Sequence, residues 1–377
     1  MRRFLAVALV VAVSLVFAAN IKIGLFVPLS GIGADDGESA LHGAMLAVRY
    51  INDHGGVLGK KLELVYYDDQ TDPKQSVSLA YKLVQKDGVV AVISGSYSGP
   101  TRAAAGIYQR LKTPMISAYA VHPDITRAGD FIFRVGTLAT VQGRAGAHLA
   151  VEKLKAKRIA LLVMDNDFGV SLANAFKEEA KRLGAQIVFE EKFAVGEKDF
   201  RTVLEKIKKL DPDVIYATGY YFNASKIVTQ AKELGIYQTI IGQEGYDSPL
   251  FIELSKNHAA NGTVITTDLD RDSERKVVQW FMAEYEKQFG RPADMVAASA
   301  FDAVMILAKA MEIAGSTSKV AIKKALYQVK DIQSVTGFKH FTKDREAVRE
   351  VVCQVILGDR FHRLWVIDDP KIVTPGK

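Results

Sequence analysis

Apolar runs of strand length alternate with amphipathic helical patterns in the first part of the chain, and this rhythm limits the possible folds more than any other feature. In the first expected helix, Ala44, Val48 and Ile51 recur at helical spacing, and two glycines follow as a stop signal. The alternation predicts a parallel sheet covered by helices on both faces. Strands are expected at 21–27, 62–67, 89–93 and 114–117, and helices at 39–53, 73–86 and 101–111.

A second series of the same kind follows, and no flexible linker or repeat separates it from the first. The chain has 377 residues, which is more than a single hydrophobic core usually accommodates, so we expect two α/β lobes. Periodicity leaves open whether the late helices return to the first lobe. The expected strands are 158–164, 186–193, 214–218, 239–242, 263–267, 351–357 and 364–367, and the expected helices are 169–183, 200–210, 222–234, 274–289, 295–314 and 318–329.

The N-terminus is typical of a secretory signal peptide. Arg2 and Arg3 precede an apolar run, 4–17, that ends in small residues. We expect residues 1–18 to be removed, with cleavage after Ala18 or one residue later. The run is shorter than the ~20 residues of a spanning helix, so an uncleaved anchor is the less favoured alternative. A single cysteine, Cys353, allows no internal disulfide, and an exported protein of this kind suits the bacterial periplasm.

Charge and motif patterns argue against several functional classes. The 49 basic and 43 acidic residues are interspersed, so we expect no nucleic-acid partner. The seven histidines are scattered and form no zinc motif, and neither a phosphate-binding loop nor a dinucleotide fingerprint occurs. We therefore expect no metal and no cofactor. The acidic stretch 68–73 is read as a strand end followed by a helix cap at Asp72, not as a calcium loop.

The segment 95–99, Gly-Ser-Tyr-Ser-Gly, lies where an expected strand gives way to a helix. A nucleophile elbow needs serine at the centre of such a turn, but Tyr97 stands there, so we expect a protein that is not an enzyme. Ser98 and backbone N–H groups at a helix N-terminus favour an anion, and the absence of Lys and Arg favours a carboxylate. A plain helix cap without ligand is the alternative.

Glu244 follows the expected strand 239–242 and is close to two glycines, Gly242 and Gly245. Ligands of open parallel sheets sit beyond the carboxyl ends of the strands, so this carboxylate could meet a cation in a cleft. A solvated loop carboxylate is the alternative. Ser98 in one lobe and Glu244 in the other would suit the two charges of a zwitterion.

These features occur together with longer stretches that resemble a known family, the hydrophobic amino-acid binding proteins of bacterial ABC importers, of the leucine/isoleucine/valine-binding type. The resemblance covers essentially the whole mature chain. It implies a type I periplasmic binding fold, with two doubly wound parallel-sheet α/β lobes and a three-segment hinge. Its most specific parts are IKIGLFVPLSG, GAMLAVRYINDHGGVLGKKLELVYYDDQTDPKQSVSLAYKLV, PMISAYAVHPDIT, AVGEKDF and GQEGY.

The resemblance also implies lobe limits, partners and a function. The first lobe would comprise 20–139 plus 268–350, and the second 140–267 plus 351–377. The protein would be a monomer of the periplasm that captures a small-molecule amino acid and delivers it to the membrane permease of an ABC importer. No catalysis is implied.

The same resemblance implies roles for residues around the ligand head group. Ser98 would hold the α-carboxylate. The carbonyl of Tyr119 and the carboxylate of Glu244 would meet the α-ammonium. Val121 stands where the family has a threonine, so it would offer a backbone N–H but no hydroxyl. Ala120 belongs to the same expected pocket.

Further positions concern the ligand side chain. Phe168 would close the pocket from the second lobe, and Tyr220 would lie near the ligand head group. Asp36 stands where leucine-binding proteins carry a tyrosine, and it would enlarge the pocket, bind water or meet a basic group. Tyr97 is expected to belong to the same pocket. Leucine or phenylalanine would suit this pocket. The alternative is an amide, urea or aromatic-acid ligand on the same fold.

Overall fold

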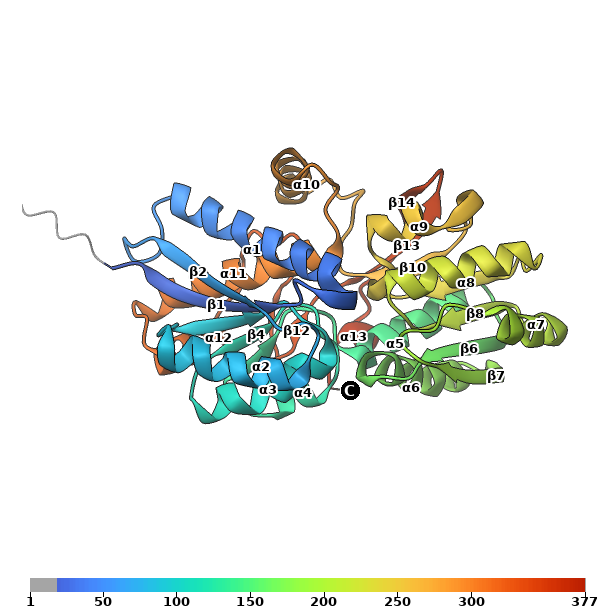
Figure 1. The fold of residues 1–377 in the computed structure, drawn as a ribbon, viewed down its shortest axis with the longest axis horizontal. Coiled ribbons are helices and arrows are strands. Elements are labelled where there is room, and N and C mark those ends of the chain that lie inside the picture. Colours follow the sequence, from blue (N-terminus) through green and yellow to red (C-terminus); the bar gives the residue numbers. More distant parts are fainter. Residues whose placement is uncertain (1–18, 377) are drawn as a thin grey trace, which may run out of the picture.

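The computed structural model describes residues 19–376, so the expected signal peptide lies outside the described residues. Two sheets with their helices stand side by side (Figure 1). We call the five-stranded sheet and its helices the first lobe, and the seven-stranded sheet and its helices the second lobe. A short hairpin, β11 (His340–Phe341) and β12 (Ala347–Val348), is separate from both sheets.

The first lobe is a parallel sheet with helices on both faces, as the alternating pattern predicts. Side chains of β1 alternate: Leu25 and Val27 pack toward α1 (Ala34–Asp53), whereas Phe26 packs toward α2 (Pro73–Tyr81) and α3 (Ser98–Arg110). The strand order is β2-β1-β3-β4-β5, with β1 (Ile21–Val27), β2 (Leu62–Asp68), β3 (Ala91–Ser94), β4 (Met115–Ser117) and β5 (Ile132–Arg134). Asp72 caps α2 and accepts a hydrogen bond from the Lys74 N–H, as expected.

The second lobe has a mixed sheet, which differs in part from the expected parallel one. Its order is β14-β13-β10-β9-β8-β6-β7, and β13 and β14 run antiparallel at one edge. Gly358 and Asp359 join these two strands with positive φ angles of 55° and 58°, which suits a tight hairpin turn. The bounds are β6 (Arg158–Met164), β7 (Gln186–Phe193), β8 (Val214–Ala217), β9 (Thr239–Gly242), β10 (Val264–Thr267), β13 (Val351–Leu357) and β14 (Arg360–Ile367).

Helices again cover both faces of this sheet. One face packs on α5 (Ala139–His148) and α6 (Asp167–Arg182), and the other on α7 (Arg201–Leu210) and α8 (Tyr221–Glu233). Neither β5, the short α4 (Asp124–Arg127) nor α5 was expected from the sequence. The α5 sequence is rich in small residues, because α6 approaches it closely: a Cβ on Gly143 would lie 2.6 Å from the backbone nitrogen of Phe176.

The late helices α10 (Lys276–Phe289), α11 (Met295–Ala314) and α12 (Lys319–Leu326) follow β10, and α11 returns to the first lobe. It lies along α1, as Figure 1 shows. A Cβ on Gly43 would lie 2.1 Å from the carbonyl oxygen of Ala297, so only glycine permits this approach. The packing answers the question that periodicity leaves open.

A buried ion pair joins the three segments that connect the lobes. Arg349, between β12 and β13, contacts Asp268, just after β10, at 3.1 Å. Thr137, between β5 and α5, donates its N–H to the same carboxylate at 3.0 Å. The expected lobe limits lie close to these three residues, and the limits themselves stay a prediction.

Candidate ligand-binding site

A nearly closed cavity lies between the lobes, at the carboxyl ends of strands from both sheets. We call it the interlobe cavity. It contains every residue expected in the pocket except Val121, and it adds four that were not expected. The lining residues are Asp36, Tyr97, Ser98, Tyr119, Ala120, Phe168, Tyr220, Glu244, Gly245, Asp247, Met295 and Val296.

Val121 is buried but does not line the cavity. Its carbonyl accepts a hydrogen bond from the Ala139 N–H at 3.1 Å, where the chain passes from the first lobe to α5. The expected contact of its backbone N–H with a ligand carboxylate stays a prediction.

Ser98 lies at the first position of α3, three residues before the expected start of that helix. The capping position belongs to Tyr97, and no side chain caps the helix there, so Ser98 is not a plain cap. The Ser98 side chain is 2% exposed, and its Oγ has no hydrogen-bond partner among the described residues. A buried hydroxyl without a partner is unfavourable, which indicates that a ligand supplies one.

The first turn of α3 adds backbone donors beside this hydroxyl. Pro100 at the third position has no N–H, and the Thr101 N–H is bonded to the Tyr97 carbonyl at 3.0 Å. The N–H groups of Ser98 and Gly99 therefore remain as the donors of this turn, with no acceptor within the described chain. Together with the positive end of the helix dipole, they suit a small anion.

Glu244 provides the opposite chemistry from the second lobe. It is 3% exposed, and neither carboxylate oxygen has a hydrogen-bond partner within the described residues. Burial, and then the charge of Asp268, hold the pKa of Glu244 well above its usual range. A ligand cation would satisfy this carboxylate and favour its ionised form.

The turn that holds Glu244 packs tightly on the end of β8. A Cβ on Gly245 would lie 2.3 Å from the Gly219 carbonyl oxygen, so a larger residue would displace the turn. Gln243 donates to the same carbonyl at 2.9 Å. Asp247 also lines the cavity, but Arg271 donates to it at 3.0 Å, so this carboxylate already has a cation.

Aromatic rings from both lobes meet at the cavity. Tyr97 of the first lobe stacks on Tyr220 of the second, with centroids 4.2 Å apart and planes at 11°. Phe168 also stacks on Tyr220, with ring centroids 4.9 Å apart. Tyr119 meets Tyr97 edge-on and donates its hydroxyl to the Gly95 carbonyl at 2.9 Å. Direct stacking across the lobes shows that the structure is a closed form.

Two further lining residues, Met295 and Val296, come from the start of α11. The sequence identified this helix, and in the structure Asp294 caps it by accepting the Ala297 N–H at 2.8 Å. The sequence did not show that the helix start reaches the cavity. That placement depends on the contact between α1 and α11.

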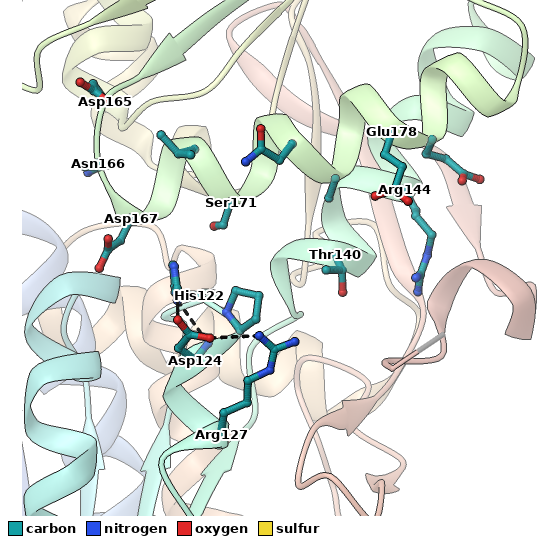
Figure 2. A pocket seen from close by; sticks show the side chains of 15 residues that line it. His122, Asp124, Arg127, Thr140, Arg144, Asp165, Asn166, Asp167, Ser171 and Glu178 are labelled. Atoms are coloured by element: carbon teal, nitrogen blue, oxygen red, sulfur yellow. Dashed lines mark hydrogen bonds and ion pairs between the residues drawn. The ribbon is translucent and has the colours of Figure 1, made fainter.

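A larger hollow opens elsewhere between the lobes. We call it the polar groove. Its volume is about 720 Å³, and its walls come from α4, α5, α6 and the turns before α4 and α6. In Figure 2, Asp124 lies between His122 and Arg127, and the Asp124–Arg127 ion pair measures 3.0 Å. Arg144 donates to the Ile372 and Thr374 carbonyls at 2.9 Å. No residue expected in the pocket lines this groove.

Comparison with known proteins agrees with this architecture. The family model for periplasmic binding proteins matches residues 20–357. The chain belongs to the periplasmic binding protein family. A leucine-, isoleucine-, valine-, threonine- and alanine-binding protein of Pseudomonas aeruginosa is 32% identical over 330 residues, which are 86% of this chain and 87% of that protein.

Two solved structures extend the comparison. The binding protein LivJ of the branched-chain amino acid transporter of Streptococcus pneumoniae, in complex with isoleucine, is 30% identical and has a TM-score of 0.86, covering 92% of this chain and 99% of that one. A solute binding protein of an ABC transporter from R. palustris, in complex with benzoate, is 23% identical with a TM-score of 0.84, covering 92% and 96%. The second likeness concerns the fold alone.

These relatives confirm the expected fold class and a binding protein rather than an enzyme. Family membership also implies a periplasmic or extracytoplasmic location. Within residues 19–376, no helix has both the length and the hydropathy needed to cross a bilayer.

Proposed function

We propose that this periplasmic binding protein captures a hydrophobic α-amino acid, aliphatic or aromatic, in the interlobe cavity and delivers it to the permease of an ABC importer. The observation that carries the proposal is a pair of unsatisfied groups on one cavity. Ser98 offers a buried donor from the first lobe, and Glu244 offers a buried acceptor from the second. A zwitterionic head group supplies the missing partner to both.

Ligand capture would then proceed from one lobe to the other. The amino acid docks first on Ser98, Tyr119 and the neighbouring backbone. Closure brings Phe168, Tyr220 and Glu244 onto it. Because the ligand contacts both lobes, it binds the closed form better and shifts the population toward closure. Exclusion of water strengthens the ion pair with Glu244.

A calorimetric and thermal-shift screen of the mature protein against amino acids tests this proposal. A ligand at about 100 times its Kd should stabilise the protein by about 2.7 kcal/mol. Two derivatives of the best ligand test the two ends separately: the N-acetyl form removes the ammonium, and the amide form removes the carboxylate. Both should bind much more weakly. Undiminished binding of the N-acetyl form would contradict the role of Glu244.

A second candidate is an amide, urea or aromatic acid, none of which carries an ammonium group. It is favoured by the raised pKa of Glu244, because a protonated carboxyl can donate a hydrogen bond to a neutral ligand. Benzoate, acetamide and urea belong in the same screen. Tight binding of one of these, with no amino acid bound, would support this candidate over the first.

Export and oligomeric state complete the proposal. We propose that residues 1–18 act as a signal peptide and that the mature protein is a monomer. N-terminal sequencing of protein exported by a bacterial host, and light scattering of the purified protein, test these two points.

A further inference from the structure

A second acidic side chain faces the interlobe cavity without a cation. Asp36, in the first turn of α1, is 5% exposed and lines the cavity. The Tyr97 hydroxyl donates to its Oδ2 at 2.6 Å, and this is the one hydrogen bond to that carboxyl found within residues 19–376. A tyrosine hydroxyl has a single proton to donate, so it satisfies one of the two carboxyl oxygens.

Neighbouring charges do not satisfy Asp36 either. Arg291 is bound in a two-pronged contact to Asp35, at 2.6 and 3.1 Å. Asp294 adds a further negative charge nearby, while its own carboxylate accepts from Ser39 at 2.6 Å. The residues that line the cavity include no Lys, Arg or His. Any further partner for Asp36 must therefore come from what enters the cavity.

The head group of a zwitterionic ligand cannot be the partner of Asp36, because its charged groups are needed at Ser98 and Glu244. Its single ammonium is needed at Glu244, which comes from the opposite lobe and has no partner on either oxygen. Burial raises the pKa of Asp36 to about 8, so the empty cavity holds protonated and ionised carboxyl near neutral pH. A donor from the ligand would stabilise the ionised form.

We propose that Asp36 and Tyr97 form a side-chain subsite that selects α-amino acids whose aliphatic or aromatic side chain carries a hydrogen-bond donor. The inference rests on the proposed function, because the head group must occupy Ser98 and Glu244 for the side chain to reach Asp36. A site built to accept a hydrogen bond rejects an isostere that lacks the donor, since its buried acceptor is left unpaired.

Matched pairs of ligands test the subsite by calorimetry on protein freed of co-purified ligand. Valine and threonine, phenylalanine and tyrosine, leucine and asparagine, and norleucine and ornithine differ mainly by a hydroxyl, amide or ammonium donor. In at least one pair the donor-bearing member should bind at least about tenfold more tightly. The pair with the largest ratio identifies the donor. Equal or weaker binding of the donor-bearing member in every pair would overturn the subsite.

Variants of Asp36 test whether this residue causes the affinity ratio within a ligand pair. Asp36→Leu removes the acceptor and should bring the affinity ratio to within about twofold. Asp36→Asn serves if the leucine variant does not fold, and it should reduce the ratio because the charge is lost. Asp124→Asn is the matched control: its carboxylate pairs with Arg127 in the polar groove, away from the cavity, so the ratio should not change. An unchanged affinity ratio in folded Asp36 variants would show that Asp36 does not select ligands with a donor.

The outcomes separate this inference from the proposed function. If both members of each pair bind equally well, the amino-acid function stands and the subsite fails. If no member of any pair binds the unaltered protein, the proposed function and the subsite fail together.

Discussion

The interlobe cavity and the polar groove are both hollows between the lobes, but they differ in how their polar groups are satisfied. The groove is large and rich in charge, yet its Asp124 has Arg127 and its Glu179 has Arg182 and His148. The cavity is almost sealed, yet Ser98 and Glu244 lack partners there. Unsatisfied buried groups locate a ligand better than size does, because only they gain from its arrival.

Replacing Glu244 should reduce ligand affinity more than any other change in either hollow. Glu244→Ala leaves a desolvated ligand ammonium unpaired, and affinity for an α-amino acid should fall by about 3 kcal/mol or more. Calorimetry with the best ligand measures the loss. Binding like that of the unaltered protein would contradict the assignment of this carboxylate.

Replacing Ser98 should have the next largest effect. Ser98→Ala removes a hydrogen bond to a charged carboxylate, so affinity should fall by about 1.5–3 kcal/mol while the N–H donors of the turn remain. The melting temperature of the empty protein should change little or rise, since the buried hydroxyl has no partner there. A loss of affinity below about 0.5 kcal/mol would show that the hydroxyl has no part in binding.

The pH dependence of ligand affinity tests whether Glu244 in the interlobe cavity must lose a proton when the ligand binds. The raised pKa of Glu244 means that the empty protein holds a proton that must leave before an ion pair forms. Affinity for a zwitterion should therefore increase as pH rises toward that pKa, by at most about 1.4 kcal/mol per pH unit, and then level off. The facing carboxylates of Asp268 and Asp247 strengthen the shift. A flat profile between pH 5 and 8 would count against ionised Glu244. Glu244→Gln should make the profile shallower and leave only the part that Asp36 contributes.

An ion pair near both hollows should contribute less. Arg102 on α3 contacts Asp167 at the start of α6 at 2.9 Å, so it joins the lobes, but both side chains are partly exposed. Arg102→Ala should weaken binding by about 0.2–1 kcal/mol by favouring the open form. Small-angle scattering without ligand should show a larger radius of gyration than for the unaltered protein. An unchanged radius and affinity would show that this pair does not help closure.

A change in the polar groove should have the smallest effect. Glu178 is an exposed residue of the groove, and Glu178→Ala should change ligand affinity by less than about 0.5 kcal/mol. Calorimetry under the conditions used for Glu244→Ala gives the comparison directly. A loss comparable to that of Glu244→Ala would reverse our choice between the two hollows.

Much of the fold could be predicted because strong local patterns coincide with its elements. The strands 158–164 and 351–357 and the helix 295–314 begin and end where expected. Where local signals are weak the prediction failed. Strand β5 has only three residues, and α5 owes its place to close packing of Gly143 on α6 rather than to an apolar stripe.

The candidate site likewise contains some residues that local sequence patterns predict and others that they do not. Ser98 and Glu244 could be expected because each is a polar group at a strand end or helix start, where parallel sheets place their ligands. Met295 and Val296 could not, because their position depends on the long-range contact between α1 and α11. The pairing of Asp36 with Tyr97 likewise joins residues distant in sequence.

Pro100 limits the number of hydrogen-bond donors that the first turn of α3 presents to the cavity. Since it withholds the third N–H of the helix turn, the hydroxyl of Ser98 and two backbone N–H groups leave three donors in all. Three donors match a planar group with two oxygens and a single negative charge. A tetrahedral dianion would bring more lone pairs than this turn can saturate, with no cationic side chain to balance it. We therefore expect Pro100 to disfavour phosphate and sulfate, the anions that helix starts otherwise attract.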